Sequence, residues 1–267
     1  MTNAFFVVWR ESLEAFLIAG ILFAWLKAND DSGRGRRALF TGLGAGVLLA
    51  LALGWALLTV QDELTGQALE IFQTATLLVA AGLITQMVLW MHRHGRRMKA
   101  RLHAELSTAA ERSGYLGVAV VAALAVAREG AETVIFLYGL AQGSDLLPLI
   151  VGSTAGFVGA AATAWLAAKS LTRLNLGLLL RLSSILLLVL ASSLLIAASD
   201  RLIGTDWLPA LIDPVWDSSA LLDDGTTGGK LLADFTGYRA RPALTTLLVW
   251  LGYWALVFFG IRRAQHA

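Results

Sequence analysis

Residues 7–16, VVWRESLEAF, decide the fold of this chain, because they place three charges inside an apolar segment. The charges are Arg10, Glu11 and Glu14, in the spacing R-E-x-x-E. Residues 127–136, AREGAETVIF, repeat this spacing with Arg128, Glu129 and Glu132. Positions three and four apart share one face of a helix. The pattern therefore predicts two helices, each directing one arginine and two glutamates into the same sector.

The composition around these motifs is that of a membrane protein. The 267 residues are 57% hydrophobic and 15% charged, whereas soluble domains carry about 25% charged residues. The formal net charge of +2 excludes the strongly basic field typical of nucleic-acid binding. Cysteine is absent, which excludes disulfides and thiolate ligands. No phosphate-loop pattern occurs, so we expect no ATP hydrolysis.

Apolar runs long enough to cross a bilayer require about 20 residues. The sequence predicts seven such helices, near residues 4–26, 39–60, 69–91, 115–141, 147–169, 177–199 and 243–261, followed or separated by polar connections. The expected fold is thus all-α, one polytopic membrane domain over residues 1–267. The first helix carries charges early and has no basic leader, so we expect it to remain in the mature chain. Clustered glycines predict close helix packing in the second and fifth spans: Gly42, Gly44, Gly46, Gly152, Gly156 and Gly159.

The basic residues predict the orientation of the chain. Lysine and arginine gather in the first, third and fifth connections and at the C-terminus, whereas the segment 200–242 is acidic. By the positive-inside rule, the N-terminus lies outside and the C-terminus inside. The two motif helices then run in opposite directions. This predicts an inverted repeat of three plus three helices followed by a seventh helix, an architecture that places binding sites at the repeat interface.

Buried charges of this kind are expensive. Each costs roughly 2.5–3.5 kcal/mol near the bilayer centre on insertion scales. One interpretation is two neutralised ion pairs that hold helices together. However, four carboxylates outnumber two arginines, and an anionic cluster in a membrane favours a cation. Carboxylate oxygens suit hard ions, such as Fe(III), Mn, Ca or Mg, better than Cu(I) or Zn.

The four glutamates Glu11, Glu14, Glu129 and Glu132 are therefore the candidate metal ligands, and Arg10 and Arg128 are their supporting charges. A membrane-embedded carboxylate metalloenzyme and a structural subunit are the alternatives. Against the enzyme, di-iron sites in helical bundles commonly use Glu-x-x-His pairs, and no histidine lies in a predicted span. Further acidic residues could gather cations at the outer entrance or form an ordinary solvated surface: Glu70, Asp217, Asp62 and Glu63, with Asp223 and Asp224 behind them.

The paired motifs also resemble those of the oxidase-dependent iron transporter family, which includes the fungal high-affinity iron permease and bacterial Efe-type permeases. Segments 173–177 (RLNLG), 216–222 (WDSSALL) and 237–242 (GYRARP) extend the resemblance over nearly the whole chain. It implies a permease of the bacterial inner membrane that imports iron, as Fe(III) formed by an extracytoplasmic oxidase or brought by a delivery protein. Iron would be the transported substrate, with no organic cofactor, and the four motif glutamates would bind it. Gln73 stands where the family pattern predicts a second acidic residue beside Glu70, which puts a full outer site in doubt.

Overall fold

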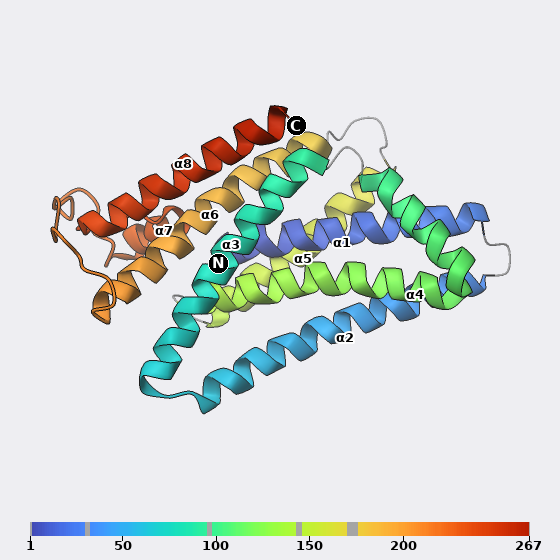
Figure 1. Cartoon of the computed structure of the whole chain (residues 1–267), viewed down its shortest axis with the longest axis horizontal. Helices are drawn as coiled ribbons and strands as arrows, with labels where there is room; N and C mark the ends of the chain where they lie inside the picture. Colours follow the sequence, from blue (N-terminus) through green and yellow to red (C-terminus); the bar gives the residue numbers. More distant parts are fainter. Residues whose placement is uncertain (1, 30–32, 95–97, 143–145, 170–175, 267) are drawn as a thin grey trace.

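The computed structural model describes residues 2–29, 33–94, 98–142, 146–169 and 176–266. Within these ranges the chain is helical and contains no strand (Figure 1). The helices are α1 (Thr2–Asn29), α2 (Arg34–Glu63), α3 (Gly66–His94), α4 (Met98–Ala141), α5 (Leu146–Lys169), α6 (Leu176–Gly204), α7 (Thr227–Thr236) and α8 (Leu244–His266). Part of the RLNLG segment, residues 173–175, lies outside the described ranges.

Each of the seven predicted spans is helical. Within the described ranges, five helices are long and apolar enough to cross a membrane, namely α2, α3, α5, α6 and α8. The other two long helices carry the charged motifs, α1 near its middle and α4 near the middle of the part that follows Gly114. The chain is therefore an integral membrane protein by its apolar helices, and seven crossings with the N-terminus outside stay a prediction.

Two connections contain more helix than the sequence predicted. The third connection forms the first part of α4, which breaks at Gly114, where φ is 57° and ψ is −137°. Residues 98–113 lack a long apolar run, yet Leu106 from this part is fully buried. The acidic segment 200–242 is likewise not a plain loop, because α6 continues to Gly204 and α7 lies within the segment. Thr226 caps α7 by accepting a hydrogen bond from the Gly229 amide.

The main helix packing joins the two halves of the sequence. Helix α1 packs on α5, α4 packs on α2, and α3 packs on α6, while α1 and α4 also contact each other. These pairs are symmetric between the two halves: if each helix of α1–α3 is replaced by its counterpart in α4–α6, and the reverse, the same pairs result. In Figure 1, α1 and the part of α4 after Gly114 run in opposite directions.

Glycines permit the two closest helix pairs. A Cβ atom added at Gly42 of α2 would lie 2.2 Å from the backbone oxygen of Ala119 in α4. A Cβ atom at Gly156 of α5 would lie 2.5 Å from the backbone oxygen of Phe5 in α1. Gly44, by contrast, faces open space. Small residues therefore allow each motif helix to approach its partner backbone, as membrane helices commonly do.

Two buried apolar clusters lie on either side of the charged motifs. The first includes Ala4 and Val7 of α1 with Phe136 and Leu140 of α4, beside residues of α3, α6 and α8. The second joins the other ends of the same helices through Leu22, Leu26, Val118 and Ala122, together with Leu39 and Leu106. The charged residues are therefore enclosed by apolar packing along both α1 and α4.

Candidate metal site

The two motifs lie deep in the helices that carry them. Glu11 is about 14 Å along the helix from the start of α1, at 1.5 Å per residue, which is close to half the thickness of a bilayer core. Glu129 stands near the middle of the part of α4 that follows Gly114. The helical register therefore places both motifs at comparable depth, between the two apolar clusters.

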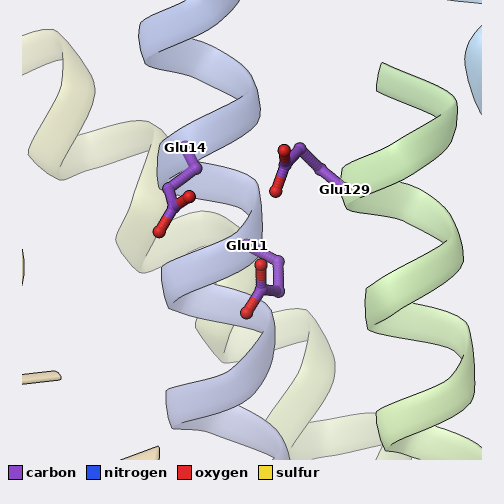
Figure 2. Close-up of side chains that lie close together, drawn as sticks. All are labelled: Glu11, Glu14 and Glu129. Atoms are coloured by element: carbon purple, nitrogen blue, oxygen red, sulfur yellow. The ribbon is translucent and has the colours of Figure 1, made fainter. Parts of the chain in front are cut away.

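Three of the four predicted ligands come together. Glu11 and Glu14 of α1 and Glu129 of α4 each offer a carboxylate oxygen, and these three oxygens lie within 4.8 Å of one another. All three residues are buried. Figure 2 shows Glu129 pointing from α4 toward α1. Oxygen ligands at this spacing, taken from two different helices, suit a hard cation between them.

Arg10 is locked into this cluster from one side. Its side chain has no exposed surface, and its two terminal nitrogens lie 2.9 Å from Glu11 Oε1 and 2.8 Å from Glu14 Oε1. The same nitrogens donate to the sulfurs of Met87, at 2.8 Å, and Met91, at 2.7 Å, both on α3. Arg10 is thus shared between two carboxylates of its own helix and two thioethers of a neighbouring helix.

Arg128 occupies a different environment, although its motif is the same. Its side chain is 50% exposed, and it donates to Glu132 Oε1 through Nε at 3.0 Å. The distance from Nε to Glu129 Oε1 is 3.9 Å. Its guanidinium carbon lies 5.2 Å from the centroid of the Trp90 ring of α3. Glu132 pairs with Arg128 and is not one of the three glutamates grouped above.

Several buried carboxylate oxygens have no hydrogen-bond partner among the described residues. They are Glu11 Oε2, Glu129 Oε2 and Glu132 Oε2, together with Glu14 Oε1, which lies 2.8 Å from Arg10 as an ion pair but accepts no hydrogen bond. A buried charged oxygen without a partner carries a large desolvation cost. The arginines therefore satisfy only part of the acceptor capacity of the cluster, and the rest is available to a cation.

A cavity of about 630 Å³ reaches the cluster between α1, α2, α4 and α5. Glu11 and Glu129 border it, together with hydroxyl groups of Ser12 and Thr133. Most of its other lining is aliphatic or aromatic, from residues such as Val47 of α2 and Phe157 of α5. Glu11 and Glu129 thus border a mostly apolar cavity, while their unpaired oxygens Glu11 Oε2 and Glu129 Oε2 are themselves buried.

The predicted entrance residues lie apart from this cluster. Glu70 is exposed and borders a separate cavity with Thr74 and Trp207, and Asp62 and Glu63 are exposed at the end of α2. Asp217 is held by Arg241, whose Nε lies 3.0 Å from Oδ2, and by Ser219. Gln73, the departure from the family pattern, accepts a hydrogen bond from Arg201. An amide at this position therefore pairs with a cation of the protein.

Sequence reasoning missed the contribution of α3 to the site. The charged motifs give no role to Met87, Trp90 or Met91. Their positions, 87, 90 and 91, have the spacing of one helix face, which is the signal that could have grouped them. The spacing does not predict which arginine each of them contacts, because that depends on how α3 packs against the other helices.

Comparison with known proteins identifies a family that the chain matches. The model of the iron permease FTR1 family matches residues 1–262. The chain is 30% identical over 261 residues to the ferrous iron permease EfeU of Shigella sonnei, covering 96% of this chain and 94% of the relative. It has the same identity and coverage with EfeU of Escherichia coli O157:H7. The EfeU protein of Yersinia pestis is 27% identical over 259 residues, covering 96% of this chain and 92% of the relative. No solved structure matches the chain.

Proposed function

We propose that this chain, which belongs to the iron permease FTR1 family, imports iron across the bacterial inner membrane through the carboxylate cluster between α1 and α4. Its family and relatives make it a transporter rather than an enzyme. Iron is its transported substrate. The observation that carries the proposed site is the approach of Glu11, Glu14 and Glu129 within 4.8 Å, deep in the bundle.

The proposed ligands are the four motif glutamates, with Glu132 joining the other three when Arg128 moves aside. In the all-ionised state four carboxylates exceed two guanidiniums by two negative charges. We propose Fe(III), formed by an extracytoplasmic oxidase or brought by a delivery protein, as the ion that crosses. Fe(II) is the rival candidate, because it would neutralise the excess charge and because the relatives are named ferrous iron permeases.

Movement of the ion is proposed to follow an inverted-repeat mechanism, with α1–α3 and α4–α6 as the repeats. The exchange symmetry of the helix pairs supports it. The two apolar clusters on either side of the charged residues would open alternately, one toward the outside and one toward the inside. A site at a repeat interface is typical of such transporters.

Uptake by purified protein in liposomes tests the proposal. Radioactive iron would be supplied to one sample as Fe(II), without oxygen and with a reductant, and to another as chelated Fe(III). We expect Glu11→Gln, Glu14→Gln and Glu129→Gln each to abolish uptake, because each removes one anionic ligand. Glu111→Gln is the matched control, since Glu111 is exposed on the first part of α4 and belongs to no proposed site, and it should transport like the unaltered protein.

The form of iron that is taken up decides between the two valences. Uptake from the Fe(II) sample alone would refute the ferric proposal and leave the carboxylate site intact. Full uptake by all three cluster variants would remove the cluster from the mechanism.

A further inference from the structure

Both motif arginines rest against one face of α3, formed by Met87, Trp90 and Met91, which we name the α3 cradle. Met87 is 4% exposed, and Trp90 and Met91 are partly buried. The cradle contacts Arg10 through its two sulfurs and Arg128 through its indole ring. We propose that the α3 cradle occupies part of the bonding capacity of both guanidiniums, so that each arginine engages fewer motif oxygens and the remaining oxygens stay available to iron. This inference rests on the proposed function.

The arginines are the natural competitors of the ion. Each is covalently tethered beside the carboxylates, and a guanidinium can engage a carboxylate through two parallel N–H bonds. Full engagement of the carboxylates by both guanidiniums would fill the positions that a cation needs. A transport site therefore requires something that limits this pairing.

Trp90 limits the pairing of Arg128. The guanidinium carbon lies 5.2 Å from the ring centroid, within the range of a cation–π contact. In this position only Nε donates to Glu132, and Glu129 Oε2 and Glu132 Oε2 keep no hydrogen-bond partner. Without the ring, the terminal nitrogens of Arg128 are free to turn onto these oxygens. The half-exposed side chain has the space to do so.

The methionines limit the pairing of Arg10. One terminal nitrogen divides its N–H bonds between Glu11 and Met87, and the other pairs with Glu14 and donates to Met91. Leucine at both positions would remove the sulfur acceptors and keep a similar volume. The N–H groups would then have only the carboxylates as partners. Glu14 Oε1, which lies 2.8 Å from an Arg10 nitrogen but accepts no hydrogen bond now, would become such an acceptor.

The test measures iron affinity and maximal uptake separately for variants of the cradle. Trp90→Leu should raise the KM for iron uptake about 3- to 30-fold, the range of a cation–π contact. Maximal uptake should change little, because the carboxylates remain. Trp90→Phe keeps an aromatic face and should restore the KM to within about 3-fold of the unaltered protein. Met87→Leu with Met91→Leu should also raise the KM.

Trp165→Leu is the matched control. The Trp165 ring of α5 lies 4.1 Å from the amino group of Lys169, so it is a second tryptophan with a cation contact. It is 57% exposed, and its loss should leave the KM unchanged. Equilibrium iron binding to the detergent-purified variants gives a second readout, with a rise in Kd that matches the rise in KM.

The outcomes separate this inference from the proposed function. If Glu129→Gln abolishes uptake while the Trp90→Leu protein and the double methionine variant keep the original KM and Kd, the cradle has no positioning role. Equal affinities of Trp90→Leu and Trp90→Phe, both weakened, would also overturn the role of the ring face. If Glu129→Gln transports normally, the proposed function fails instead. Should Trp90→Leu not fold, the double methionine variant alone decides.

Discussion

Replacing Arg10 by methionine should cost far more stability than the same change at Arg128, although the two residues occupy the same motif position. Arg10 has no exposed side-chain surface and pairs with Glu11 and Glu14 at 2.9 and 2.8 Å. Its loss leaves two buried carboxylates without their cation. Removing one partner of a buried ion pair costs about 3–5 kcal/mol.

The Arg128 side chain is 50% exposed and pairs with Glu132. Pairs this exposed contribute about 0–1 kcal/mol. Since 1 kcal/mol shifts the Tm of a chain of this size by about 2–4 °C, Arg10→Met should lower the Tm by roughly 6–20 °C. Arg128→Met should lower it by less than about 4 °C. Thermal unfolding of the detergent-purified proteins, followed by tryptophan fluorescence, measures both.

A triple variant identifies the cause of the loss. Arg10→Met combined with Glu11→Gln and Glu14→Gln removes the guanidinium and both unpaired charges, so it should recover a large part of the lost Tm. Equal shifts for the two single arginine variants would refute the reasoning, because the calculation depends entirely on their different burial. No recovery in the triple variant would show that Arg10 stabilises by packing and not by charge.

Two further predictions concern helix packing and the acidic segment. Gly156→Val should lower the free energy of unfolding by about 1–3 kcal/mol, because its Cβ would lie 2.5 Å from the backbone oxygen of Phe5. Gly44→Ala should be neutral or stabilising, because Gly44 faces open space. Unfolding of the two variants in detergent measures both changes. Hydrogen bonds from Ser219 and the Arg241 guanidinium lower the pKa of Asp217. The contribution of this carboxylate to stability is therefore present above its usual pKa of about 3.9, and it is lost as the pH falls through the lowered value. Asp217→Asn should therefore speed hydrogen exchange in residues 216–222 at pH 7. The difference from the unaltered protein should disappear once the pH is below the lowered pKa of Asp217. A difference that persists at such a pH would contradict this account.

The sequence was most informative where a spacing had a direct geometric meaning. The three- and four-residue spacing of the motifs places Glu11 and Glu14 on one side of α1, and the structure brings both to Glu129. Apolar runs likewise marked every long helix. These features depend on helix periodicity and length, which are local properties of the chain.

Other features depend on packing that no single segment encodes. The first part of α4 and the short α7 contain too few consecutive apolar residues to be predicted as spans. Arg10 is buried and Arg128 is half-exposed, and α3 presents two sulfurs to the first and a ring to the second. Identical motifs gave no reason to expect that difference.

The pairing of α1 with α5, of α2 with α4 and of α3 with α6 has a consequence for how the chain can be divided. Packing within each half is sparse, so a fragment ending after α3 would expose the surfaces that the other fragment normally covers. The halves are interlocked partners rather than separable bodies. Two fragments cut between α3 and α4 should therefore accumulate only when they are produced together in the same membrane.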